Sequence, residues 1–271
     1  MTNLSYTFSD AATMLRRNLV HMKRYPIMLM IVVAMPIVLL LLFVFVLGET
    51  LGAGIGGAGG LGGLTGLNGR DEYLKYVIPG ILLMAVASGT QGTAIAVAQD
   101  MTEGIIARFR TMAISRGAVL AGHVLGSVIQ TMLGTAVVVA FALLIGFRTT
   151  GSLFDWIAAI GVLTMIAFAL TWLSAALGMV SKTVEGASNL PLPLVLLPFF
   201  GSGFVPTSSM PGAVSWFAEN QPFTPFIETV RGLLMGTPTG NSLLLTIIWC
   251  IVISLGGYLW ALALYNRSSA R

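Results

Sequence analysis

The chain alternates long uncharged apolar segments with short charged ones, a pattern typical of a protein that crosses a membrane several times. The first such run, residues 27–47, has 21 residues without a charge. At about 1.5 Å per residue this is enough to cross a hydrocarbon core of about 30 Å. Five further segments follow the same pattern. We therefore predict six transmembrane helices, at about residues 27–47, 76–99, 118–146, 156–181, 189–205 and 242–264.

The second and third predicted spans carry polar side chains. Five of these fall in the second span and predict a stripe that faces protein or a polar cavity rather than lipid. They are Ser88, Thr90, Gln91, Thr93 and Gln99. In the third span, Gly122 and Gly126 form a G-x-x-x-G pattern suited to close helix packing. His123 between them is expected to be a packed or interfacial residue rather than a ligand.

Prolines interrupt the region around the fifth span, and residues 206–240 are expected to be extracytoplasmic and partly immersed in the membrane. Within this region we predict a short helix with Thr224 as its N-cap, Pro225 at its first position and an end near Gly236. Glu228 and Arg231 are three residues apart, so they are expected to pair on the water-facing side of that helix.

Two amphipathic segments and one glycine-rich segment lie outside the spans. Residues 1–25 predict a basic amphipathic helix at the membrane surface. Residues 100–117 predict a second one, with Ile105, Phe109 and Met112 on one face at about 100° per residue. An ordinary solvated loop helix is the alternative. Residues 52–69 contain a G-x-G-x-x-G match, but repeated glycine gives it by chance, and an extracytoplasmic linker is expected there.

The distribution of charged residues supports a membrane protein with six spans and predicts which side faces the cytoplasm. Charged residues make up 9% of the chain, against about 25% in a typical soluble domain. The side that holds both termini, residues 100–117 and residues 182–185 has ten basic and four acidic residues, a net charge of +6. The other side has four basic and six acidic residues, a net charge of −2. The positive-inside rule predicts that the first side is cytoplasmic, which makes the chain a multi-pass plasma (inner) membrane protein with both termini in the cytoplasm.

The sequence offers little chemistry of its own. It has no P-loop motif, no H-E-x-x-H pattern and a single cysteine, Cys250. No carboxylate lies deep in a predicted span, which argues against a pump that relies on an intramembrane acid. We therefore expect no catalytic, cofactor-binding or metal-binding residue, and any energy for transport must come from another protein.

Three stretches carry a family resemblance. The first is YLKYVIPG (73–80). The second is DMTEG (100–104) with RFR (108–110), ISR (114–116) and AVLAG (118–122). The third is FVP (204–206), MPG (210–212), FAEN (217–220) and RGLLMG (231–236). Together and in this order, they resemble the ABC-2-type permeases, and specifically the daunorubicin-resistance (drug or lipid exporter) permease family. Ala113 stands where the family pattern leads us to expect proline, which leaves the turn out of the 100–117 helix open.

The resemblance implies a permease that pairs with a second copy or a paralogous permease and with cytosolic ATPase subunits, which bind the ATP. The 100–117 helix would be a coupling helix that contacts the ATPase. Its expected interface residues are Glu103, Gly104, Ile105, Arg108, Phe109, Arg110 and Met112.

The sequence therefore predicts an all-α polytopic membrane protein, a single six-span ABC-2-type transmembrane domain with a cytosolic amphipathic N-terminal helix and a cytosolic coupling helix. It would export a hydrophobic or amphipathic small molecule or a lipid, without being an enzyme itself and without binding nucleic acid. An exporter of polysaccharide or another polar polymer is the first alternative. A stand-alone channel or secondary transporter is the second.

Overall fold

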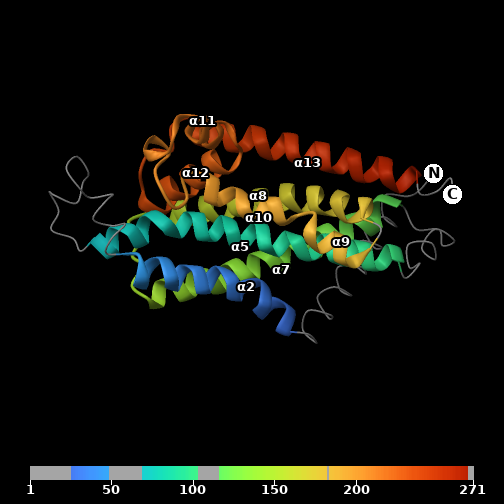
Figure 1. Ribbon diagram of the computed structural model, residues 1–271, viewed down its shortest axis with the longest axis horizontal. Coiled ribbons are helices and arrows are strands. Elements are labelled where there is room, and N and C mark those ends of the chain that lie inside the picture. The colour runs from blue at the N-terminus through green and yellow to red at the C-terminus, as the bar shows by residue number, and fades with distance from the viewer. Residues whose placement is uncertain (1–25, 49–68, 103–115, 182, 268–271) are drawn as a thin grey trace.

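The computed structural model describes residues 26–48, 69–102, 116–181 and 183–267, which form helices and no strand. The long helices lie side by side along the longest axis of the molecule (Figure 1). In chain order the main helices are α2 (Pro26–Leu41), α5 (Gly69–Thr102), α7 (Arg116–Leu144), α8 (Leu153–Val180), α11 (Gly212–Asn220), α12 (Phe223–Met235) and α13 (Ser242–Arg267). The predicted all-α class is confirmed for the described residues.

Four helices are long and apolar enough to cross a membrane. They cover Asp71–Thr102, Gly122–Leu144, Leu153–Val180 and Ser242–Tyr265, and they coincide with the second, third, fourth and sixth predicted spans. Shorter apolar helical stretches, Val33–Val46 and Val184–Phe200, lie at the first and fifth predicted spans. The total of six spans stays a prediction.

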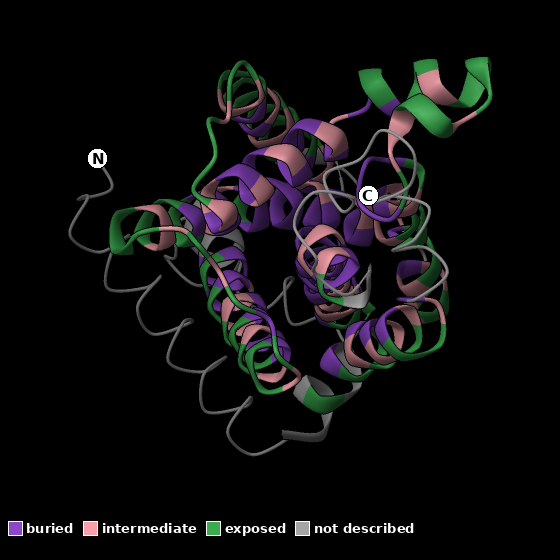
Figure 2. Cartoon of the chain, turned by 90° about the vertical axis from the view of Figure 1, so that its left-hand side faces the viewer, coloured by how far each residue is buried: buried purple, intermediate pink, exposed green. Residues whose placement is uncertain are grey.

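Helix α5 is the centre of the bundle. It packs against α2, α7, α8 and α12, whereas α13 packs on the outside against α8 and α12. Its first half contains an uninterrupted buried stretch, from Val77 to Ala87. Seen end-on, the long helices turn their buried faces toward one another and their exposed faces outward (Figure 2). A helix surrounded by others on several sides can relay a displacement from one end of the bundle to the other.

Local capping fixes where two helices begin and end. Ser152 and Asp155 form a reciprocal capping box at the start of α8. Gly236 ends α12 in the left-handed conformation with φ 65°, which glycine adopts at low cost. The predicted end at Gly236 is confirmed, but the predicted N-cap is wrong. The helix begins at Phe223, and the Thr224 hydroxyl donates to the carbonyl of Ala218 instead of capping it.

The predicted fifth span is not one continuous helix. It begins at the last residue of α9 (Val184–Asn189) and continues through α10 (Leu192–Leu196) and a 3₁₀ turn, η2 (Leu197–Phe200), into turns at residues 201–204. Prolines at 191, 193 and 198 explain the breaks, because each lacks an N–H and clashes with the preceding turn. The Thr183 hydroxyl accepts from the N–H of Gly186 and so caps α9.

The predicted coupling helix at 100–117 needs correction at both ends. Residues 100–102 continue α5, and Arg116 and Gly117 open α7. Asp100 was predicted to belong to a helix at the membrane surface, but its side chain is buried beside α7. The rest of this segment, residues 103–115, lies outside the described residues, as do residues 1–25 and most of the glycine-rich segment.

Candidate functional site

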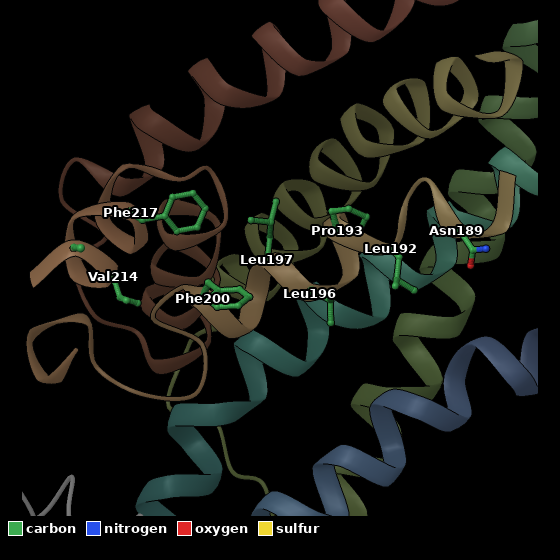
Figure 3. A pocket seen from close by; sticks show the side chains of 9 residues that line it. Asn189, Leu192, Pro193, Leu196, Leu197, Phe200, Val214 and Phe217 are labelled. Atoms are coloured by element: carbon green, nitrogen blue, oxygen red, sulfur yellow. The ribbon is translucent and has the colours of Figure 1, made fainter. Parts of the chain in front are cut away.

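An open apolar groove of about 640 Å³ runs along the broken segment between α9 and α11. Figure 3 shows Leu192, Leu196 and Phe200 spaced along this segment, with Val214 and Phe217 of α11 at one end and Asn189 at the other. The remaining lining residues are Pro193, Leu197 and Ala213. Asn189 is the one lining residue with a polar side chain, so the groove suits a largely apolar molecule.

The spacing of the lining residues explains how a broken segment forms one continuous surface. Leu192, Leu196 and Phe200 are each four residues apart, so they share one face although α10 passes into a 3₁₀ turn. All three side chains are about half exposed in this chain. Such exposed apolar side chains contact lipid, another protein or a bound molecule.

Arg231 holds the end of this segment that lies near η2 to the bundle. Its Nη2 donates to the backbone carbonyls of Ser202 at 2.6 Å and Tyr76 at 3.2 Å, and its Nη1 donates to Glu228 Oε1 at 2.7 Å. The guanidinium carbon also lies 4.0 Å from the centre of the Tyr76 ring, a cation–π contact. One side chain of α12 therefore joins α5 to the segment that follows η2.

The predicted Glu228–Arg231 pair is confirmed, but its predicted setting is wrong. The Arg231 side chain is 15% exposed and that of Glu228 is 40% exposed, so the pair is not simply on a water-facing surface. Arg231 is mostly buried because its guanidinium packs over the Tyr76 ring and donates to the backbone carbonyls of Tyr76 and Ser202. Inside a membrane protein such carbonyls need internal partners.

Further contacts fix the same segment. The Gln221 amide donates from Nε2 to the carbonyl of Leu197 at 3.1 Å. The backbones of Gly80 in α5 and Gly203 approach so closely that a Cβ at Gly80 would lie 2.8 Å from the Gly203 carbonyl oxygen. Phe204 stacks on Phe199 with ring centres 4.5 Å apart. The groove wall is thus anchored to both α5 and α12.

Thr90, Gln91 and Thr93 of α5 face protein, as predicted. Thr90 and Thr93 are buried, and Thr93 contacts the Ser127 hydroxyl of α7. The Gln91 amide donates to the backbone carbonyl of Ser188 in α9. Gln99 departs from the predicted stripe because it is exposed. These contacts connect α5 to both the helix before the groove and its neighbour in the bundle.

A carboxylate and an imidazole meet at the opposite end of α5. His123 Nε2 lies 2.9 Å from Asp100 Oδ2, and the two side chains are 10% and 9% exposed. His123 is thus a packed residue, as the sequence predicted. No group of three His, Cys, Asp or Glu side chains that could hold a metal occurs among the described residues.

The predicted ATPase-facing residues, Glu103 to Met112, all lie outside the described residues. The structure does place the last turn of α5 and the first turn of α7, which flank them, at one end of the bundle. Figure 1 shows this end opposite α11 and α12. The coupling role of these residues stays a prediction.

Comparison with known proteins decides the family. The model of the family described as "ABC-2 type transporter" matches residues 10–235. The chain belongs to this family. It is 31% identical over 231 residues to the daunorubicin resistance ABC transporter permease protein DrrB1 of Streptomyces coeruleorubidus, which covers 84% of this chain and 76% of that protein. It is also 26% identical over 186 residues to the probable doxorubicin resistance ABC transporter permease protein DrrC of Mycobacterium tuberculosis, which covers 67% of each chain. The family resemblance found in the sequence motifs is confirmed.

The sequence reasoning missed three features of this ABC-2 permease. It did not predict the groove, although the four-residue spacing of Leu192, Leu196 and Phe200 was available as a signal. It assigned Arg231 to a water-facing surface and Asp100 to a surface helix. An ionisable residue next to a long apolar run is itself a signal of a buried pair, and Asp100 ends such a run.

Proposed function

We propose that this chain is the membrane-spanning subunit of an exporter that moves a hydrophobic or amphipathic small molecule or a lipid out of the cytoplasm. The energy would come from ATP hydrolysed by a separate ABC ATPase, because the chain has no P-loop motif. Family membership and the similarity to bacterial drug-resistance permeases support this proposal.

The observation that carries the choice of cargo is the apolar groove. A long, open surface lined by leucine, proline and phenylalanine gains free energy from contact with an apolar molecule, roughly 25 cal/mol per Å² buried. Asn189 at one end offers an amide to a polar group of an amphipathic molecule. A polar polymer would find few hydrogen-bonding partners along this lining, which favours drug or lipid over polysaccharide.

The proposed complex contains the ATPase and a second copy of this chain or a paralogous permease, in the plasma (inner) membrane. The charge division of +6 and −2 supports a topology with both termini and residues 103–115 in the cytoplasm. The groove segment is then tied to the bundle near the outer surface through Arg231, and the Asp100–His123 pair lies near the inner surface.

The test measures ATP-driven transport of daunorubicin in membrane vesicles that contain the permease and its ABC ATPase. Leu196→Ala removes an apolar contact from the middle of the groove. A lost contact of this size weakens binding by about 1–2 kcal/mol, so we expect roughly tenfold weaker apparent affinity for the drug.

Leu245→Ala is the matched control, because Leu245 is 46% exposed on α13 and Leu196 is 45% exposed. This control should leave transport unchanged. Equal transport by the two variants would show that the groove surface contacts lipid rather than cargo. Transport without added ATPase or ATP would favour the channel or secondary transporter.

A further inference from the structure

The buried Asp100–His123 pair joins two helices that are consecutive in the chain. Asp100 lies two residues before the end of α5, and His123 lies in the second turn of α7. Their 2.9 Å contact therefore fixes the end of α5 next to the beginning of α7. Both residues also lie at the ends of candidate spans, Asp71–Thr102 and Gly122–Leu144.

This contact is a costly way to hold two helices together. A carboxylate with 9% exposure has lost most of its hydration, and a partner restores only part of that free energy. Two apolar side chains of similar size would pack α5 on α7 with less cost. What a buried polar pair adds is a defined geometry, since its strength depends on direction and distance far more than apolar packing does.

Helix α5 connects the Asp100–His123 pair to the wall of the groove. Asp100 and Tyr76 are on the same helix and 24 residues apart, a separation of about 36 Å. Tyr76 and Gly80, at the outer end of α5, contact Arg231 and Gly203, which hold the wall of the groove. Any displacement of the inner end of α5 therefore reaches the groove segment, provided that α5 moves as one body.

We propose that Asp100 and His123 are positioning residues for ATP-driven transport. Their contact sets the spacing and rotation of α5 relative to α7 at the membrane end from which the ATPase-facing connection departs. With the pair intact, a push on that connection displaces α5 together with its outer contacts. Without the pair, the ends of α5 and α7 move apart, and the displacement does not reach the outer contacts of α5. This inference rests on the proposed function as an ATP-driven permease.

The experiment compares transport of daunorubicin per ATP hydrolysed in vesicles that contain the full permease and its ABC ATPase. His123→Leu leaves the carboxylate without its imidazole contact, and Asp100→Leu does the converse. We expect both variants to copurify with the ATPase and to hydrolyse ATP. The transport per ATP should fall at least about fivefold, the low end of typical couplings between sites. Gln99→Leu, a neighbouring exposed position on α5, should leave this ratio unchanged.

Two double variants separate positioning from simple packing and keep the test valid where a single variant folds poorly. Asp100→His with His123→Asp restores the pair in reverse and should restore most of the transport per ATP. Asp100→Leu with His123→Leu restores packing without the polar contact and should remain uncoupled.

The inference is overturned if the variant with Asp100→Leu and His123→Leu transports as much daunorubicin per ATP as the parent. Asp100 and His123 would then contribute only to packing. It is equally overturned if the reversed pair fails to restore coupling. If the parent permease binds no ATPase at all, the proposed function itself fails, and this result is distinct from an uncoupled but assembled complex.

Discussion

At the residue scale, a few polar side chains stabilise the structure by donating hydrogen bonds to backbone carbonyls. Arg231 donates to the backbone carbonyls of Tyr76 and Ser202, and Gln221 donates to that of Leu197. A carbonyl without a donor costs several kcal/mol in a lipid-like interior, so these side chains make the broken segment possible. A planar fork with several donors suits this task better than a single ammonium group.

Changing Arg231 should therefore lower stability in proportion to the donors that are lost. Arg231→Lys keeps the charge but cannot reach all three acceptors, and Arg231→Met removes every donor. Losing the partner of one buried carbonyl costs about 1–3 kcal/mol, so the thermal unfolding midpoint of the purified permease should fall for Lys and fall further for Met.

Glu228→Gln is the control for the Arg231 variants. Glu228 is the more exposed partner, and the two carbonyl bonds of Arg231 remain in this variant. A small change in the midpoint is expected, because partly exposed ion pairs contribute little. A midpoint for Arg231→Met equal to that of the parent would show that the carbonyls of Tyr76 and Ser202 do not depend on this side chain.

At the scale of elements, proline decides what becomes of the fifth apolar segment. Residues 189–205 are apolar and uncharged, yet the chain divides them into the end of α9, the short helix α10, the 3₁₀ turn η2 and the turns that follow it. The irregular part is tolerated because α5 and α12 cover it and supply donors. By contrast α8, which contains no proline, runs without a break from Leu153 to Val180.

Residues 103–115, which connect α5 to α7, are predicted to bind the ATPase. The sequence places Phe109 at the centre of the predicted apolar stripe, and burying such a ring contributes about 1.5–3 kcal/mol. Phe109→Ala should therefore weaken copurification of the ATPase roughly tenfold or more, while the permease still inserts into the membrane.

The paired variant Arg108→Glu with Arg110→Glu tests orientation at the same element. It places like charges beside Glu103, so we expect reduced transport-coupled ATP hydrolysis at normal expression. If Phe109→Ala and the charge-reversed variant both bind the ATPase and transport like the parent, residues 103–115 form a surface loop without a coupling role.

At the scale of the whole molecule, one long helix links the two ends of the bundle. Helix α5 contacts Arg231 and the groove wall at one end and ends beside His123 at the other. Figure 1 shows α11 and α12 at one end of the bundle and α9 at the opposite end. If the chain is the proposed ATP-driven exporter, this helix is a direct route between the two ends of the bundle.

The orientation of the bundle in the membrane can be tested with single cysteines. In a Cys250→Ala background, cysteines introduced by Gly60→Cys and Ser269→Cys should react from opposite sides of intact cells, because six spans place these positions on different sides. Only Gly60→Cys should react with a membrane-impermeant reagent added outside. Reaction of both from outside would contradict the six-span topology.

The sequence by itself determined the class of protein, the positions of four long spans and the family. These features depend on the length of apolar runs and on short motifs, so residues that are close together in the sequence are enough to predict them. The end of α12 at Gly236 and the Glu228–Arg231 pair were equally local, and they were predicted correctly.

Only the tertiary structure decided which polar side chains are buried and what they contact. Arg231 meets Tyr76, 155 residues away in the chain, and Asp100 meets His123 across two helices. Periodicity places a side chain on one face of a helix but does not say whether water, lipid or another helix covers that face. For Asp100, Arg231 and the groove from Asn189 to Phe217, that covering is what determines their chemistry.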